Sequence, residues 1–227
     1  ATYVKVRRKG QSTSQAILVV AGVNDEGRRE ILTWRAADTE SEDTWTEVFR
    51  ELKQRGVKGV QWLISDGHLG IQAAVRTQFN GVGWQRCWTH FLRAAMAKVG
   101  HKHKAALAGE LRVARTHSTL EICLMESERV AERWEGQYPR VATQIRDQFE
   151  ETLTVHGLPK EHQRRVYTSN MIERVMTEIK RRTKVVGIFP NAESADRLIG
   201  AHLLERHEKW QCERARYLDM DRLDANV

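Results

Sequence analysis

Two acidic side chains, far apart in the sequence, are candidates for holding a metal ion. Asp66 follows the apolar run 60–65 and precedes Gly67, which predicts a carboxylate at the tip of a buried strand, just before a turn. Glu173 lies in the segment 170–174, within a stretch of helical pattern. Mg²⁺ prefers oxygen ligands, so carboxylates placed in this way indicate metal-dependent phosphoryl transfer on nucleic acid.

Each carboxylate also has an ordinary explanation. Asp-Gly is a common turn, so Asp66 by itself could be a turn former. Glu173 by itself could be a surface acid of a helix. Glu178 is its nearest rival, but at about 100° per residue it lies about 140° around the helix from Glu173, so the two would not face one metal ion.

Composition favours a polyanionic partner. The chain has 227 residues and a formal net charge of +7, with 30% charged and 41% hydrophobic residues, as expected of a globular protein. No apolar run approaches the ~20 residues of a membrane span, and no signal peptide is visible. The three widely spread cysteines do not indicate a disulfide framework. We therefore expect a cytoplasmic protein without a membrane partner.

A dense basic run follows Glu173. It predicts binding to phosphates of nucleic acid, although a solvated helix face is the alternative. Arg174 and His68 are further candidates for contacting DNA, and a solvated histidine beside a turn is the alternative for His68. The run consists of Lys180, Arg181, Arg182 and Lys184.

The pair Cys87 and His90 has a spacing that zinc ligands often show. A structural zinc site needs four ligands, and no second pair of suitable spacing is nearby in the sequence. A structural zinc site is therefore disfavoured, and the family resemblance described below implies that Cys87 and His90 serve in packing or in contacting DNA near the site.

Hydrophobic periodicity predicts a mixed α/β fold. Apolar alternation and short turns predict an antiparallel meander, and a strand, a helix and another strand then predict a parallel crossover. The pattern from residue 88 to about 165 is almost entirely helical. The expected strands are 1–9, 15–23, 29–36, 60–65 and 82–86, with turns at 10–14 and 24–27, and the expected helices outside the helical block are 41–55, 70–78, 170–182 and 192–210.

This order of elements is that of a ribonuclease H-like fold. It predicts a mixed five-stranded sheet, with three antiparallel and then two parallel strands, and an all-helical insertion before the last core helices. The expected regions are the first part of the core at 1–90, the insertion at 91–165, and the completion of the core at 166–227.

Several segments resemble the Mutator-like transposases of bacterial insertion sequences, which use an Asp-Asp-Glu active site. The resemblance covers essentially the whole chain, and the combination of these segments carries it. The segments are GVNDEGRRE at 22–30, ISDGHLG at 64–70, QRCWTH at 85–90, NMIER at 170–174, EIKRRTKVVGIFPN at 178–191 and LLERHEKW at 203–210.

The resemblance implies a role for each acid. Asp66 matches the second catalytic Asp of the family and Glu173 the catalytic Glu, and the first catalytic Asp would stand immediately before Ala1. We therefore expect a fragment that begins at its first strand, lacks the family's DNA-end-binding region, and cleaves DNA poorly. The implied cofactor is Mg²⁺, with Mn²⁺ as an alternative, in two-metal-ion phosphoryl transfer.

The implied partners are the DNA of transposon ends and of the target, together with further copies of the chain in a homo-oligomer near the bacterial nucleoid. Two other hypotheses stay open. The chain could be a non-catalytic remnant that binds DNA or multimerises with an intact transposase. It could also be another ribonuclease H-like nuclease, such as a resolvase.

Overall fold

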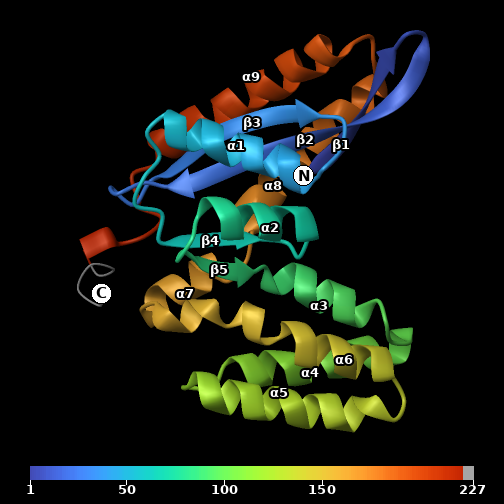
Figure 1. The fold of residues 1–227 in the computed structure, drawn as a ribbon, viewed down its shortest axis with the longest axis vertical. Helices are drawn as coiled ribbons and strands as arrows, with labels where there is room; N and C mark the ends of the chain where they lie inside the picture. The colour runs from blue at the N-terminus through green and yellow to red at the C-terminus, as the bar shows by residue number, and fades with distance from the viewer. Residues whose placement is uncertain (222–227) are drawn as a thin grey trace. The chain divides into compact units, whose positions relative to one another are not determined.

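The computed structural model describes residues 1–221, which fall into two compact units. Unit 1 contains Ala1–Val60, Leu69–Gly81 and the chain from Asn170 onward, and unit 2 contains Gln61–His68 and Val82–Ser169. The element order is labelled in Figure 1. The regional boundaries expected from the sequence stay predictions, and positions 222–227 of the last expected region lie outside the described residues.

The antiparallel meander is confirmed in unit 1. Strands β1 (Thr2–Arg8), β2 (Gln11–Val23) and β3 (Arg29–Ala37) pair in sequence order. The turn expected at 10–14 is wrong, because only Lys9 and Gly10 turn, with φ of 49° and 81°. Two residues of positive φ are enough to close a tight hairpin. The polar residues 11–14 therefore belong to β2 and pair with β1.

The strands form two sheets, not the single five-stranded sheet that the sequence predicts. Unit 1 has the order β3-β2-β1-β6, in which β6 (Ile188–Phe189) runs parallel to β1. In unit 2, β4 (Trp62–Ser65) and β5 (Gly83–Arg86) pair in parallel on their own. In the expected sheet, β4 would pair with the edge of β1 that β2 leaves open. In the structure, β6 pairs along part of that edge. The expected crossover itself is confirmed, since α2 (Leu69–Gln78) joins β4 to β5.

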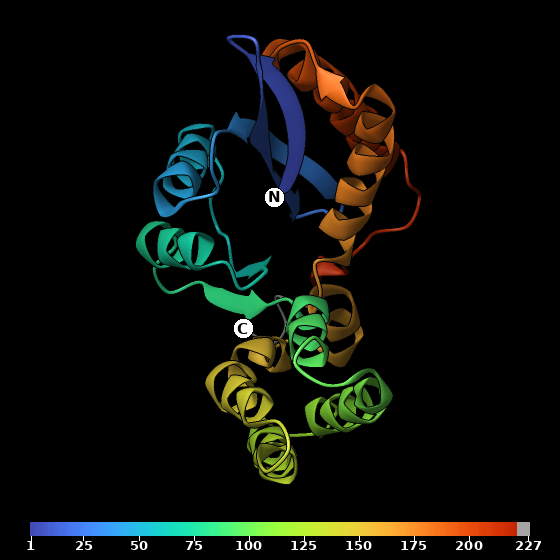
Figure 2. The ribbon, with the colours of Figure 1, turned by 90° about the vertical axis from the view of Figure 1, so that its right-hand side faces the viewer.

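Helices cover both faces of the four-stranded sheet (Figure 2). Helices α8 (Asn170–Val186) and α9 (Ala192–Gln211) pack on one face, and α1 (Glu42–Gln54) packs on the other. The alternate side chains of β1 bury Val4 and Val6 against α8 and α9. Fully burying such a side chain stabilises the fold by about 1.5–3 kcal/mol, so this apolar layer sets how the two helices lie on the sheet.

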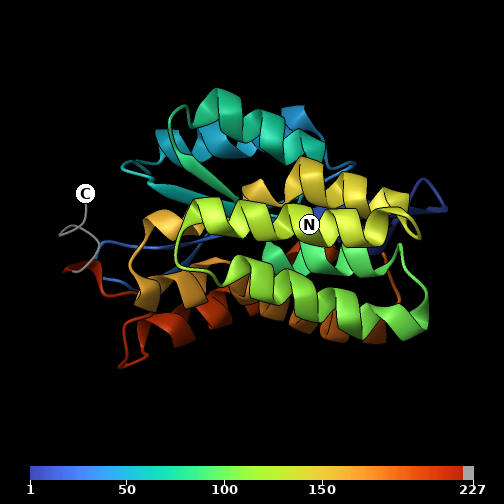
Figure 3. The same cartoon turned by 90° about the horizontal axis from the view of Figure 1, so that it is seen from below.

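Unit 2 is mainly helical, as its sequence predicts. Its helices pack around one apolar core (Figure 3), in which the ring of Phe149 lies 5.9 Å from that of Phe91 and 6.2 Å from that of Trp88. The helices are α3 (Trp88–Met96), α4 (Lys104–Arg115), α5 (Leu120–Glu135), α6 (Pro139–Gln148) and α7 (Lys160–Val166), with 3-10 turns η1 (His101–His103), η2 (Glu150–Thr152) and η3 (Thr154–Gly157).

Buried Gln85 ties β5 to the 3-10 turns of unit 2. Its Nε2 donates to the carbonyl oxygen of Thr152 at 2.7 Å, and its Oε1 accepts from the backbone N–H of Val155 at 3.1 Å. Within residues 1–221, no helix has both the length and the apolar character needed to cross a membrane.

Gly27 is expected to be the least replaceable glycine of the β2–β3 hairpin. It has φ of +77°, and a Cβ there would collide with the carbonyl oxygen of Leu218. We expect Gly27→Ala to lower the free energy of unfolding by about 3 kcal/mol, because clash adds to backbone strain. Gly59→Ala is the matched control, since φ is +65° with no atom within 4 Å, and it should cost about 1 kcal/mol. Urea unfolding measures both, and equal losses would contradict the clash.

Candidate functional site

Asp66 and Cys87 lie at the same edge of the β4–β5 pair. The two strands are parallel, and Ser65 pairs with Arg86 as their last residues. The backbone N–H of Cys87 donates to the carbonyl oxygen of Ser65 at 2.7 Å, which holds the two strand ends together. The strand-tip position expected for Asp66 is therefore what the structure shows.

The carboxylate of Asp66 is held in place but keeps binding capacity. Its Oδ1 accepts from the backbone N–H of His68 at 3.1 Å, and the residue is half-buried. Within residues 1–221, its Oδ2 has no hydrogen-bond partner and no cation pairs with it. An oriented carboxylate with an uncommitted oxygen fits a hard divalent cation.

Gly67 follows Asp66 because a side chain has no room there. A Cβ at this position would collide with the guanidinium of Arg86. The Nε of Arg86 donates to Glu151 Oε2 at 2.6 Å, and that contact anchors the guanidinium. The glycine after Asp66 is thus favoured by the packing of Arg86 from β5.

Cys87 is fully buried and begins α3. Its Sγ accepts hydrogen bonds from the backbone N–H of Ser169 at 3.3 Å and from the Ser169 hydroxyl at 3.1 Å. Burial raises the pKa of the Cys87 thiol, but hydrogen bonds with His90 and Ser169 outweigh it and lower the pKa overall. Cys87 therefore links the start of α3 to the end of unit 2, and its expected role in packing or in contacting DNA stays a prediction.

Helix α8 carries Glu173 on the side away from the apolar core. The buried residues Val175 and Ile179 face the sheet. At about 100° per residue, Glu173, Thr177, Lys180 and Lys184 fall within an arc of about 60° on the exposed side. Both lysine side chains are exposed, and within residues 1–221 neither forms an ion pair. Glu173 and two uncommitted cations thus share one stripe.

Glu178, the rival of Glu173, is committed to arginines. Its Oε1 lies 2.6 Å from Arg181 Nη2 and 3.0 Å from Arg182 Nε. Hydrogen bonds from Arg181 and then Arg182 lower the pKa of Glu178 to about 2. A carboxylate neutralised in this way is a poor candidate for a metal ligand, which leaves Glu173 as the candidate on this helix.

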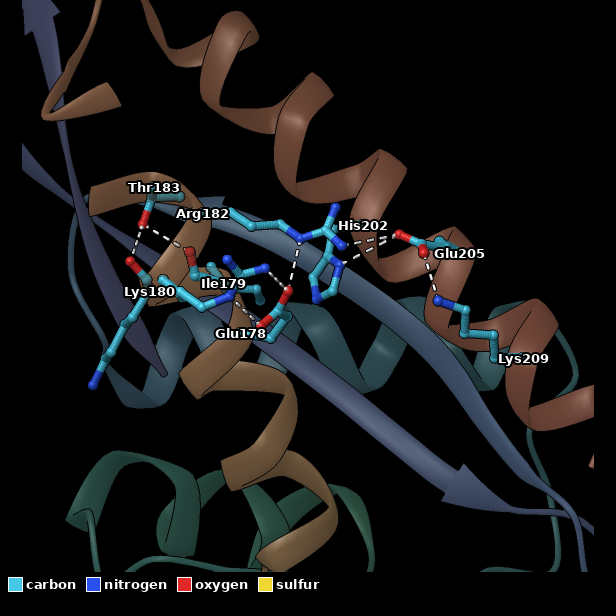
Figure 4. Close-up of polar contacts among 9 residues, drawn as sticks. Glu178, Ile179, Lys180, Arg182, Thr183, His202, Glu205 and Lys209 are labelled. Atoms are coloured by element: carbon cyan, nitrogen blue, oxygen red, sulfur yellow. Dashed lines mark hydrogen bonds and ion pairs between the residues drawn. The ribbon is translucent and has the colours of Figure 1, made fainter. Parts of the chain in front are cut away.

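Arg182 also links α8 to α9, as Figure 4 shows. Arg182 Nη2 lies 3.2 Å from Glu205 Oε2, and Lys209 Nζ lies 2.6 Å from Glu205 Oε1. Arg182 is about 180° around the helix from Glu173. The structure therefore divides the basic run into two uncommitted lysines and two arginines engaged with acids.

A groove of about 410 Å³ opens beside Glu173. Its lining adds Thr177 and Arg206, neither of which stands out in the sequence. Arg206 lies in a charged stretch of α9 that is typical of a solvated face. The sequence feature that could have drawn attention to Arg206 is its position three residues after the buried Leu203. The lining residues are Asn170, Glu173, Arg174, Thr177, Glu178 and Arg206.

The structure thus places the expected residues in two groups. Asp66, His68, Cys87 and His90 belong to unit 2. Glu173, Arg174 and the basic run belong to unit 1. A joint role for Asp66 and Glu173 stays a prediction.

Comparison with known proteins identifies the family. A family model described as Transposase, Mutator family, matches residues 1–213. The chain belongs to this family. It is 40% identical over 223 residues to the transposase for insertion sequence element ISRM5 of Rhizobium meliloti (strain 1021), covering 98% of this chain and 56% of the relative.

Other Mutator-family relatives match at similar coverage. The chain is 33% identical to the transposase for insertion sequence element IS256 in transposon Tn4001 of Staphylococcus aureus, covering 97% of this chain and 57% of the relative. It is 34% identical to the transposase for insertion sequence element IS1081 of Mycobacterium tuberculosis (strain ATCC 25618 / H37Rv), covering 97% and 53%. The chain thus spans about half the length of the curated relatives it matches.

The ion pairs of Glu178 predict a loss of stability in acid. The pKa of Glu178 is about 2 in the folded chain, below its ordinary value of 4.5. Its stabilising contribution is therefore present above about pH 4.5 and is lost as the pH falls toward 2. We expect Glu178→Gln to flatten the melting temperature against pH in that window. Glu193→Gln, on the exposed surface of α9, is the control, and an equal effect of both would contradict the assignment.

Proposed function

We propose that the chain is the catalytic part of an insertion-sequence transposase, which cuts and joins DNA by metal-dependent phosphoryl transfer. Asp66 and Glu173 are the proposed metal ligands. The observation that carries the proposal is the family match over residues 1–213 together with the uncommitted carboxylate of Asp66 at a strand tip. Half of each relative lies outside the match, so the activity is proposed from the part that matches.

The donor set fits Mg²⁺, with Mn²⁺ as an alternative. Both proposed ligands are carboxylates, and hard divalent cations prefer oxygen. Bound divalent ions supply activation of the attacking hydroxyl and stabilisation of the leaving oxygen in such reactions. The chain orients the Asp66 carboxylate through the His68 N–H, while the rival acid Glu178 is tied to Arg181 and Arg182.

The proposed DNA contacts follow from charge and from the orientation of α8. Lys180 and Lys184 extend the stripe of Glu173 by about 10 Å and 16 Å along the helix axis, at 1.5 Å per residue. They are therefore placed to bind the backbone of a strand that reaches Glu173. Arg174 and the exposed His68 are proposed as further contacts. Arg182 would act mainly by holding α8 against α9, and Arg181 by pairing with Glu178 on α8.

The proposed architecture is ribonuclease H-like with a helical insertion. Its support is the element order β-β-β-α-β-α-β, the antiparallel meander and the parallel crossover through α2. Transposon ends and target DNA are the proposed partners, with other copies of the chain in a homo-oligomer. A DNA-binding chain without catalysis is the alternative that the experiments below separate.

Charge-neutral substitutions test the two carboxylates. The family resemblance leads us to expect a further catalytic Asp immediately before Ala1, so the assay uses the chain with and without an aspartate added there. We expect the added aspartate to speed metal-dependent nicking of supercoiled plasmid. In that background, Asp66→Asn and Glu173→Gln should each slow nicking by about 100-fold or more.

Glu178→Gln is the matched control on α8, and it should retain nicking within about threefold, because its carboxylate is tied to arginines. Equal nicking by all three variants would contradict the assignment. DNA binding without any nicking, with or without the added aspartate, would favour the non-catalytic alternative.

The lysine stripe makes a prediction about salt dependence. Lys180→Gln combined with Lys184→Gln should reduce the slope of log affinity against log salt by about 1.8, because each phosphate contact contributes about 0.9. Fluorescence anisotropy with a labelled duplex in EDTA measures the slope without metal chemistry. Lys58→Gln combined with Arg76→Gln removes the same charge from exposed positions of unit 1. If both double variants lower the slope equally, the stripe has no special role.

A further inference from the structure

Arg206 is an arginine that no acid neutralises. Within residues 1–221, it forms no ion pair, and its Nε is buried without a hydrogen-bond partner. A buried N–H donor without a partner costs roughly 1–3 kcal/mol, and more when it is charged. On the same helix, Lys209 is exposed and paired with Glu205. A purely structural role would leave this cost without compensation.

Arg206 lines the groove that contains Glu173. The groove measures about 410 Å³, and Arg206 is the α9 residue in a lining otherwise supplied by α8. Arg174 also lines it, and within the described part of the chain Arg174 has no acidic partner either. Thr177 adds a hydroxyl whose oxygen donates to the Glu173 carbonyl at 2.8 Å.

The charge balance of the groove favours an anion beside Glu173. Of the two acids in the lining, Glu178 is neutralised by Arg181 and Arg182. Arg174 and Arg206 then supply two positive charges to a lining whose other acid is Glu173. Two guanidinium groups with uncommitted N–H donors match a phosphate, which accepts several charge-assisted hydrogen bonds at once.

We propose that Arg206, with Arg174, binds a backbone phosphate of the DNA strand on which the Glu173 site acts. This inference rests on the proposed function and deepens it by naming a further substrate-binding residue. The phosphate completes the hydrogen bonding of the buried Nε and holds the strand along α8. Lys180 and Lys184 lie on the same helix and contact the strand farther from Glu173.

The test measures DNA binding without divalent metal, so it does not depend on catalysis. Arg206→Gln, Arg206→Lys and the control Arg197→Gln are compared by anisotropy with a labelled duplex at several salt concentrations. Arg197 is exposed on the same helix, and its Nη2 donates a hydrogen bond to the Ser194 hydroxyl. Loss of Arg206 should weaken binding about tenfold and lower the salt slope by about 0.9, while Arg197→Gln stays within about twofold.

Arg206→Lys separates phosphate binding from a structural role. Lysine retains the charge without the planar fork, so it should restore the salt slope while leaving part of the affinity loss. The inference would be overturned if Arg206→Gln changed the DNA affinity and the salt slope no more than Arg197→Gln does. It would also be overturned if Arg206→Lys failed to restore the salt slope although its melting temperature equalled that of the unmodified chain. Failure of the unmodified chain to bind DNA would instead overturn the proposed function, and the inference with it.

Discussion

Burial of one face of α8 against the sheet is the constraint on which the rest of unit 1 depends. Val175 and Ile179 pack with Val4 and Val6 of β1 in a single apolar layer. A helix with one face buried cannot rotate about its axis without exposing that face to water. The rotation in turn decides which of the charged residues of α8 reach the groove and which reach α9. The chemistry available at Glu173 is therefore set by aliphatic side chains on its opposite side.

Ion pairing then divides the charges that this rotation exposes. Glu178 engages Arg181 and Arg182, and Arg182 continues to Glu205 on α9. Exposed ion pairs individually contribute little stability, but they decide which groups are left to bind something else. Within residues 1–221, Lys180 and Lys184 stay without an ion pair on the stripe of Glu173, and Arg174 and Arg206 line its groove. Such a distribution is typical of a surface that binds an anionic polymer beside a metal-binding carboxylate.

Unit 2 shows a different way of placing a carboxylate. The parallel pairing of β4 and β5 brings their last residues together, and the two residues that follow are Asp66 and Cys87. Arg86 packs over Gly67, and Ser169 caps the sulfur of Cys87. The position of Asp66 thus depends on a short strand pair that Gln85 anchors to the helical part of the unit.

Much of the local structure follows from the sequence alone. Alternation predicts β1 and an apolar run predicts β2, and the helical pattern of residues 88–165 predicts the character of unit 2, because the hydrophobic pattern reflects which face of an element is buried. The position of the hairpin at Lys9 and Gly10 does not follow from the sequence, since polar residues 11–14 suggest a turn although strand pairing extends through them. The family resemblance made Asp66 and Glu173 the candidate acids, but neither acid stands out by its type alone.

The sequence by itself determined the order and kind of the elements, the strand-tip position of Asp66 and the helix that carries Glu173. Only the tertiary structure decided that the strands form a four-stranded and a two-stranded sheet, since sheet partners are chosen by contacts between distant segments such as β1 and β6. It also decided that Arg182 is engaged while Lys180 is not, and that Arg206 of α9 lines the groove of Glu173. Charge is a property of the residue, but whether a charge is neutralised depends on which side chains the fold brings beside it.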